Sequence, residues 1–362
     1  MKRQTDTQRG ISLVEVMVAL ALGLIVSVGA LSLMLGNRQS YRTTEALARV
    51  QEATRITFDL MSRDLRAAGI NACSGGVRVM NLLVDPTATL PPPWWTDWNG
   101  GLRGFDNTDV SRAVAFGTGI GQRVANTDMI ELMHASTSGL PVKVHNATDA
   151  AKSLDGLTVP AQSIALEKLG VDRQPHRFLP GDLLVVCDYE DTTIFQATGV
   201  NADANSVEHL ADVGTPGNCH QSLGFRSSCT SPNAKAFQPG SQLMRFEPVA
   251  WFVGNNDGSG NDRSPTSLYR IRVASDGAGN AAPVIEEVVE GVRDMQLRYM
   301  YDRDDLYRLA SGTNKVEDWR LVTGIEITLT IESPEAGTTT DATQPRLTRT
   351  LTHVVNLRNR VP

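Results

Sequence analysis

The most apolar stretch of the chain lies close to its N-terminus. Residues 11–35 read ISLVEVMVALALGLIVSVGALSLML, a run without proline whose one charged residue is Glu15. Because roughly 20 apolar residues cross a bilayer as an α-helix, this run is long enough to span a membrane. Glycines such as Gly23 and Gly29 are tolerated within membrane helices. The pattern therefore predicts a membrane-spanning helix over residues 11–35.

Residues 36–69 are more polar but keep a helical period. An apolar or small residue recurs every three or four positions, which places the set on one face of an amphipathic helix. No proline occurs between Ile11 and Asp85, and Gly69 is a natural C-terminal stop. A continuous helix from Ile11 to Ala68 would be about 87 Å long. The stripe consists of Leu47, Val50, Thr54, Phe58, Met61, Leu65 and Ala68.

This amphipathic half of the helix needs a partner for its apolar stripe. We expect the stripe to pack on a β-sheet. A coiled-coil partner helix is the alternative, but the pattern lasts barely three heptads. The pairs Glu45/Arg49 and Asp59/Arg63 lie on the other faces, and their spacing of four residues supports the helix.

Residues 70–362 consist of short runs rich in β-branched and apolar residues, bounded by Gly, Pro and Asn. Such runs predict β-strands, and Asp318–Trp319 is expected to open a short helical turn. One dominant N-terminal helix packed on a β-rich globular domain gives an α+β fold. The predicted strands are Asp128–His134, Gln162–Glu167, Asp182–Cys187, Thr193–Val200, Gln242–Val253, Ser267–Val273, Val284–Val289, Met295–Met300, Gly324–Glu332 and Leu347–Leu357.

The composition is that of a globular protein, with 41% hydrophobic and 20% charged residues. A length of 362 residues allows one to three domains. The net charge is -6, and residues 1–10 carry a balance of +2, so the remainder is acidic at -8. An acidic chain has no broad electrostatic reason to bind nucleic acid, and no nucleic-acid partner is expected.

The basic residues Lys2, Arg3 and Arg9 precede the apolar run, so we expect a short cytoplasmic leader and an exported bulk. An ordinary secretory signal or a single-pass anchor is the alternative. However, the run is longer than a signal peptide's apolar region, and no small-residue cleavage site follows it. The break in the pattern comes earlier, at Arg9-Gly10. The leader is therefore assigned to residues 1–10.

Glu15 is the second unusual feature of this helix. A carboxylate inside a bilayer is costly and needs a partner. If the leader is removed after Gly10, the new α-amine of Ile11 is a cation at the same end of the helix. This amine can pair with Glu15 of a neighbouring subunit. The arrangement makes physical sense as an assembly device.

Gly10, Ile11 and Glu15 resemble the type IV prepilin signature: a glycine before the cut, an apolar first residue and a glutamate at the fifth mature position. The resemblance implies cleavage by a prepilin peptidase and N-methylation of Ile11. The usual first residue is phenylalanine, so Ile11 departs mildly from the family pattern. The combination of leader, glycine, glutamate and apolar run is what makes the signature specific.

Several later stretches are similar to the PilW-like minor pilins in their order along the chain. They are ITFDLMSRDLRAAGINAC, GDLLVVCDYEDTTIFQATGV, VVEGVRDMQLRYMYD, EDWRLVTGIEITLTIES and LTHVVNLRNR. This resemblance implies a minor pilin at or near the tip of a type IV pilus, where it helps prime assembly for twitching motility and adhesion.

The same resemblance implies the partners and the location of the chain. The partners would be other minor pilins, the major pilin, the prepilin peptidase, the inner-membrane assembly platform and a tip adhesin. The chain would span the inner membrane once with its globular domain in the periplasm, and would then enter the fibre on the cell surface. A J-type pseudopilin of a type II secretion system shares the helix signature but is usually shorter. A fibre-displayed adhesin or DNA-uptake module is a further alternative.

Four cysteines, Cys73, Cys187, Cys219 and Cys229, all follow the apolar run. If that run is a membrane anchor, they lie in the exported part, where disulfides persist. They allow three pairings. A local loop between Cys219 and Cys229 is the simplest, and Cys73 with Cys187 would then pin the end of the helix to the globular domain. None lies in a CxxC motif, so a zinc site is not expected.

The stretch LPPPWWTDWNGG concentrates Trp94, Trp95 and Trp98 between prolines and glycines. One interpretation is a loop whose aromatic rings cover the edge of the core. The other is an exposed surface that binds a partner or stacks on a sugar.

No constellation of residues points to catalysis or to a cofactor, so we expect a protein that is not an enzyme and holds neither a cofactor nor a metal. Nucleophile-elbow, Walker A and Rossmann motifs do not occur. The histidines show no HxxxH or HxH spacing and are expected at the surface or the edge of the core. They are His134, His145, His176, His209, His220 and His353.

Two segments resemble calcium-binding loops. In GNNDGSGND, Asn255, Asp257 and Ser259 alternate before Gly260, but Thr266 stands where an EF-hand needs glutamate. A solvated hairpin loop is the preferred interpretation. The second segment holds Asp302, Asp304 and Asp305, interrupted by Arg303 and Leu306. No calcium is expected at either place.

Overall fold

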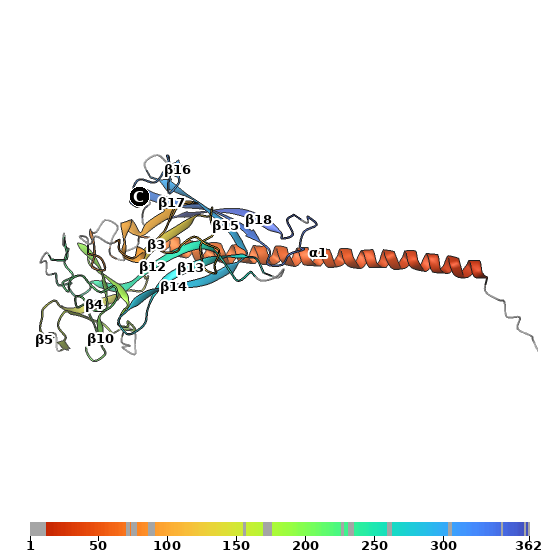
Figure 1. Ribbon diagram of the computed structural model, residues 1–362. Helices are drawn as coiled ribbons and strands as arrows, with labels where there is room; N and C mark the ends of the chain where they lie inside the picture. Colours follow the sequence, from red (N-terminus) through yellow and green to blue (C-terminus); the bar gives the residue numbers. More distant parts are fainter. Residues whose placement is uncertain are drawn as a thin grey trace, which may run out of the picture.

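The computed structural model describes residues 12–69, 73, 78–85, 91–154, 157–168, 176–225, 228–230, 235–258, 263–302, 306–341, 343–357 and 360. One long helix, α1 (Leu13–Ala67), projects from a strand-rich head, and its N-terminal half stands clear of the head (Figure 1). The α+β fold predicted from the sequence is confirmed.

Helix α1 runs through both the apolar segment and the amphipathic segment without a break. Its buried residues begin at Ala46 and include Val50, Met61 and Leu65 of the expected stripe, together with Thr57 and Ser62. The helix ends where predicted. Gly69 has φ +75°, a conformation that glycine adopts at little cost, and its N–H donates to the carbonyl of Met133 at 2.9 Å.

The head contains a sheet of twelve strands with the order β1-β9-β8-β12-β4-β7-β11-β10, from which β13, β14, β3 and β2 extend beside β12. β12 is its longest strand and joins the two regions: residues 242–245 pair with β8, and residues 246–252 pair with β3. The strands are β1 (Arg78–Asn81), β2 (Leu102–Phe105), β3 (Met129–Ala135), β4 (Leu140–Asn146), β7 (Ser163–Leu166), β8 (Leu183–Cys187), β9 (Asp191–Gln196), β10 (Gly199–Asn201), β11 (Ser206–Glu208), β12 (Gln242–Asn255), β13 (Thr266–Ser275) and β14 (Ala281–Glu290).

A second, four-stranded sheet has the order β16-β15-β17-β18 and contains the C-terminal part of the chain. Its strands are β15 (Val292–Tyr301), β16 (Leu306–Arg308), β17 (Val322–Glu332) and β18 (Thr348–Asn356). A small hairpin pairs β5 (Lys152–Leu154) with β6 (Leu157–Val159) at the end of the head farthest from the free half of α1 (Figure 1). Short 3₁₀ turns lie at Trp94–Thr96, Asn99–Gly101 and Trp319–Leu321. The last confirms the turn expected after Asp318.

The predicted strands correspond to observed strands, with one correction. The run Thr193–Val200 is two strands, because β9 ends at Gln196 and the chain leaves β8 after Ala197, whose backbone still bonds to Gly181 and Asp182. The chain then pairs with β11 as β10. Seven strands, β1, β2, β4, β5, β6, β11 and β16, are not among the predicted runs. Most have three or four residues, too few for a clear period.

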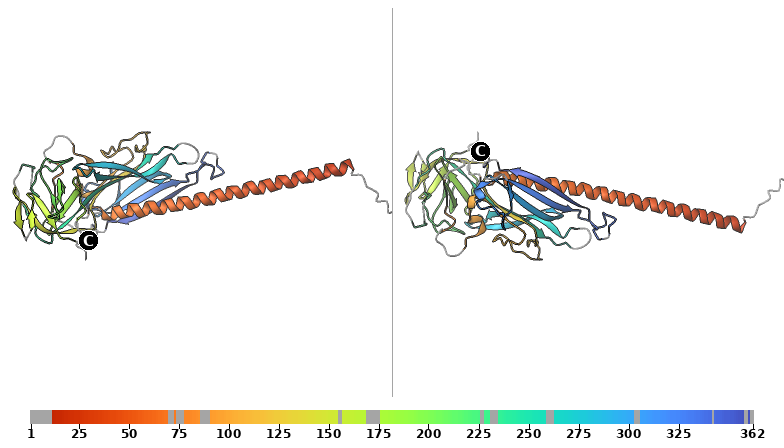
Figure 2. Two further views of the ribbon diagram at one scale, coloured as in Figure 1. Left: turned by 90° about the horizontal axis from the view of Figure 1, so that it is seen from below. Right: turned by 90° about the horizontal axis from the view of Figure 1, so that it is seen from above.

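Helix α1 lies against both sheets, in contact with β3 and β14 of the large sheet and β17 and β18 of the small one (Figure 2). Its apolar stripe therefore packs on sheets, as predicted, within a core shared by three layers. Burying one such apolar side chain contributes about 1.5–3 kcal/mol. The shared core includes Val50, Met61 and Leu65 of the helix, Ile130, Leu132 and Trp251 of the large sheet, and Leu297, Ile325 and Ile327 of the small sheet.

A buried pair of histidines lies in a separate core at the other end of the large sheet. The N–H of Phe237 donates to Nδ1 of His145 at 2.9 Å, so the proton of neutral His145 is on Nε2. That nitrogen lies 3.1 Å from Nε2 of His209, whose Nδ1 lies 2.7 Å from the carbonyl of Gln221. The chain of bonds is complete with both rings neutral. Burial lowers the pKa of both histidines, and that of His209 falls to about 4.

This pair predicts a loss of stability in acid. Between pH 6.5 and pH 4 the unfolded chain binds protons at these histidines more readily than the folded chain, so the free energy of unfolding falls as pH falls. Thermal melts of the detergent-solubilised chain should show the wild type losing stability over this range relative to His145→Gln/His209→Gln. The comparison is needed because burial raises the pKa of Asp128 to about 6 and of Glu131 to about 7, which acts in the opposite direction. A constant difference between the two proteins across the range would contradict the prediction.

Candidate assembly site

The first turn of α1 places a carboxylate at the start of the apolar segment. The carbonyl of Ser12 accepts hydrogen bonds from the N–H groups of Glu15 at 3.0 Å and Val16 at 3.2 Å, which begins the helix. A negative charge here is favoured by the positive end of the helix dipole. Gly10 and Ile11, the predicted cleavage and methylation residues, lie outside the described residues.

The apolar half of α1 is bare of protein contacts. Residues 12–38 are exposed throughout, and exposure of the large apolar side chains reaches 76% at Leu13. Soluble proteins rarely expose an apolar patch larger than a few hundred square ångströms. This part of the helix is also long and apolar enough to cross a membrane. Such a surface is stable against lipid or against other apolar helices, and Glu15 is its one charge before Arg38.

Small residues form a line along this exposed rod. Ala19, Gly23 and Ser27 follow one another at intervals of four, and Ser27 satisfies its hydroxyl by donating to the carbonyl of Gly23 at 2.7 Å. A Cβ built on Gly23 or Gly29 would meet nothing within 4 Å. Small residues at this spacing let a second helix approach closely in an apolar medium.

The polar half of α1 is attached to the head by the loop that joins β17 to β18. This attachment is at the end nearest the apolar half, which we call the lower end. The side chain of Gln39 donates to the carbonyl of Gly337 at 3.3 Å, and Thr43 donates to that of Thr338 at 2.9 Å. Arg49 forms ion pairs with Glu335 of this loop and, within the helix, with Glu45. We call residues 333–346 the strap.

The upper end of α1 is fastened by a buried hydrogen bond and a disulfide. Nε1 of Trp251 donates to the carboxylate of Asp64 at 3.0 Å, and burial raises the pKa of that carboxyl. The disulfide Cys73–Cys187 joins the segment after the helix to the end of β8. The head is thereby held rigidly relative to the helix at both ends of their contact.

The second disulfide, Cys219–Cys229, closes a local loop. The structure thus contains the pairing that the sequence favoured among three. All four cysteines are used, so the chain has no free thiol.

The tryptophan cluster is part of the core. Trp94 and Trp95 are only 3% and 4% exposed, and Trp98 packs against the same cluster with its ring centroid 6.0 Å from that of Phe246. Buried rings cannot offer a face to a sugar or a partner, so the interpretation as a binding surface is wrong for Trp94 and Trp95. The rings pack against a core cluster that includes Met133 and Phe246, which agrees with the other interpretation.

The histidines are more buried than the sequence suggested. His134, His145 and His209 are all less than 9% exposed, because strand pairing carries them into the interior. Among the described residues, no group of three or more His, Cys, Asp or Glu side chains is placed to hold a metal ion.

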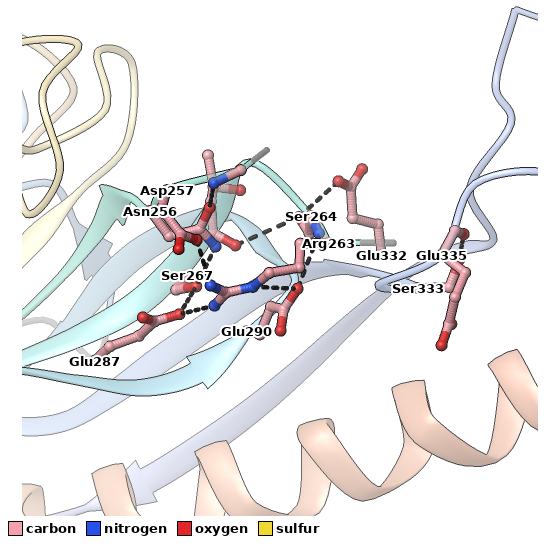
Figure 3. A network of polar contacts seen from close by, with 12 residues as sticks. Asn256, Asp257, Arg263, Ser264, Ser267, Glu287, Glu290, Glu332, Ser333 and Glu335 are labelled. Carbon is pink, nitrogen blue, oxygen red and sulfur yellow. Dashed lines mark hydrogen bonds and ion pairs between the residues drawn. The ribbon is translucent and has the colours of Figure 1, made fainter. Parts of the chain in front are cut away.

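The calcium-like loop between β12 and β13 is organised by an arginine (Figure 3). Arg263 forms ion pairs with Asp257 and with two residues of β14, Glu287 at 3.1 Å and Glu290 at 3.5 Å. The guanidinium thus supplies the positive charge that these carboxylates need. Ser259 and Gly260 lie outside the described residues, as do Asp304 and Asp305 of the second acidic segment.

Comparison with protein families finds one match. Residues 6–31 match the sequence model of the prokaryotic N-terminal methylation motif, a stretch that contains Gly10, Ile11 and Glu15. A comparison with curated proteins gives no significant match. The motif identifies the N-terminus as that of a type IV pilin-like or pseudopilin prepilin. It accounts for the bare apolar helix, because such subunits are anchored in a membrane and then assembled.

The two disulfides should contribute unequally to stability. In the chain-entropy picture, a bridge that closes a longer loop removes more freedom from the unfolded chain. Cys73–Cys187 spans 114 residues and Cys219–Cys229 spans 10. Replacing the first pair by serine should therefore cost about 5 kcal/mol, and replacing the second about 3 kcal/mol. Thermal melts of the two double variants would test the order, and a larger loss for the local bridge would contradict it.

Proposed function

We propose that this protein is a minor pilin of a type IV pilus, PilW-like, located at or near the tip, where it helps prime assembly. The observation that carries the proposal is the exposed apolar half of α1 with its lone carboxylate at Glu15, both within or next to the methylation motif at residues 6–31. The five later stretches that resemble PilW-like minor pilins also follow one another in the order typical of that family, which supports the PilW-like assignment.

The proposed processing explains the position of Glu15. A prepilin peptidase hydrolyses the Gly10-Ile11 bond, which releases the leader and leaves an α-amine on Ile11 that is then methylated. Methylation keeps the amine basic and therefore cationic. In the fibre the amine of one subunit pairs with Glu15 of its neighbour, so neither charge stays unpaired in the apolar interior.

The proposed assembly step exchanges one apolar environment for another. Subunits held in the inner membrane are extracted by the assembly platform, and their helices pass from lipid into the helical bundle of the fibre. Packing between helices then supplies the stabilisation, aided by the line of small residues at Ala19, Gly23 and Ser27. The pair between Glu15 and the α-amine of its neighbour also fixes the axial offset of adjacent helices, because the two charges meet at one offset only.

The size of the head supports a position at the tip with few copies. A domain covering residues 70–362 has a radius of gyration on the order of 19 Å. Helices packed in a bundle lie about 8–10 Å apart. If each neighbouring helix carried a head of this size, the heads would crowd one another, whereas a terminal complex leaves room for them.

The proposal predicts three observable results. Mass spectrometry of the protein from membranes should show an N-terminus at methylated Ile11. Deleting the gene should remove surface pili or reduce them severely.

Complementation with Glu15→Ala should restore few pili, because the amine of the neighbouring subunit loses its counter-charge. The control Glu52→Ala, which changes an exposed glutamate later on the same helix, should restore them fully.

Other outcomes would reassign the protein. An intact leader would exclude a processed pilin of any kind. Normal pili in the deletion strain, together with loss of protein secretion, would point to a J-type pseudopilin of a type II system. Equal rescue by Glu15→Ala and Glu52→Ala would show that the carboxylate is not an assembly contact.

A further inference from the structure

Two arginines and a tyrosine lie just beyond the apolar run on α1. Arg38, Tyr41 and Arg42 are exposed, with Tyr41 at 71%, and their spacing places them on one side of the helix. Among the described residues, neither arginine makes an ion pair or a side-chain hydrogen bond. Arg49 and Arg63, farther along the same helix, are both paired with carboxylates. The two lower arginines are thus free to bind an external anion.

Their height along the helix corresponds to the headgroup layer of a bilayer. At 1.5 Å per residue, Arg38 lies about 5 Å and Arg42 about 10 Å beyond Leu35, the last residue of the apolar run. The headgroup region extends roughly 5–8 Å beyond the hydrocarbon on each side. Arginine side chains are long enough to reach the phosphate level from these positions. Tyrosine is enriched at the same depth in membrane proteins.

The strap brings the head to the same height. Gly337 and Thr338 are hydrogen-bonded to Gln39 and Thr43, four and eight residues beyond Leu35. In Figure 1 the loop after β17 is the part of the head beside the emerging free half of α1. The strap therefore lies about 6–12 Å above the end of the apolar run.

The surface of the strap suits contact with headgroups. Its exposed residues include Gly337, Thr340 and Asp341, and Glu335 is already paired with Arg49. At the height of the headgroups, residues 38–42 and 337–341 carry two arginines and one carboxylate, Asp341, a balance of +1. Arg49, with its two carboxylate partners Glu45 and Glu335, lies farther from the bilayer along the helix. Anionic phospholipid is the chemistry that this balance favours.

Removal of the leader changes where basic side chains lie relative to the membrane. Lys2, Arg3 and Arg9 lie within the leader, so the proposed cleavage removes them. The nearest basic side chains that remain are Arg38 and Arg42, on the side of the head. After processing, the N-terminal side keeps only the α-amine of Ile11, whereas the basic side chains nearest the bilayer lie on the side of the head.

We propose that Arg38, Tyr41 and Arg42, together with the strap at residues 337–341, form a membrane seat that docks the head on anionic phospholipid headgroups before assembly. The inference rests on the proposed function, because it requires the apolar half of α1 to span a bilayer. The seat fixes the depth and tilt of the helix in the subunit pool. Extraction into the fibre breaks these lipid contacts.

A fluorescence quenching experiment on the full processed chain tests the seat. Because all four native cysteines are in disulfides, Thr340→Cys provides a single thiol for a fluorescent label at the strap. The protein is reconstituted into vesicles that contain a lipid with a nitroxide on its headgroup. One set of vesicles is rich in phosphatidylglycerol and the other contains phosphatidylcholine only. A label at Ser153→Cys in β5, at the far end of the head, serves as the unquenched reference.

The expected result is strong quenching at position 340 in anionic vesicles and weak quenching in neutral ones. Arg38→Gln/Arg42→Gln should abolish this difference, since each arginine should favour the docked head about five-fold. The matched control is Arg55→Gln/Arg66→Gln, which removes equal charge from exposed positions roughly 20 Å or more above the seat. High salt should reduce the quenching in anionic vesicles.

Equal quenching in the two lipids, or equal loss in the control variant, would overturn the membrane seat. Neither outcome would affect the proposed pilus function, which is tested by N-terminal processing and piliation. Conversely, an intact leader with lipid-dependent quenching would remove the pilin proposal and leave a docked membrane protein.

Discussion

The constraint on which the rest of this structure depends is the cost of an unpaired carboxylate on an apolar rod. Residues 12–37 of α1 offer lipid or neighbouring helices nothing charged except Glu15. A lone charge in that setting is costly and is stabilised by a nearby cation, and residues 12–37 contain no cationic side chain. The protein is therefore incomplete as a single molecule. The methylation motif over residues 6–31 places a potential α-amine at the right end of the helix to complete it.

The second requirement is that the head is firmly attached to the helix, so that a movement of the helix also moves the head. The contact between α1 and the head is closed at both ends: the strap binds Gln39 and Thr43 below, and Asp64 receives the indole of Trp251 above. Between them, the apolar stripe is buried against two sheets at once. A helix held this way cannot rotate beneath its head. A subunit moved by its helix would keep the head in one orientation, as ordered assembly needs.

Much of the fold could be predicted from the sequence because its signals are local. The helix from Leu13 to Ala67 follows from the unbroken apolar run and the period after it, and Gly69 ends it because its backbone accepts a positive φ. The longer strands are visible for the same reason. The short strands are not, since three or four residues carry no period and their pairing depends on neighbours far along the chain. Cys73 and Cys187 illustrate the limit, because the sequence allows three pairings and the sheet geometry supplies one.

By itself, the sequence determined the long apolar helix, its single carboxylate and the α+β class, because hydrophobic length, charge and period are properties of neighbouring residues. Only the tertiary structure decided which polar and aromatic groups meet. It buried Trp94 and Trp95, joined His145 to His209 and put Arg263 among the carboxylates of β14. It also brought the strap down beside Gln39, almost 300 residues earlier. Such contacts arise from strand order and loop paths, which local propensity does not encode.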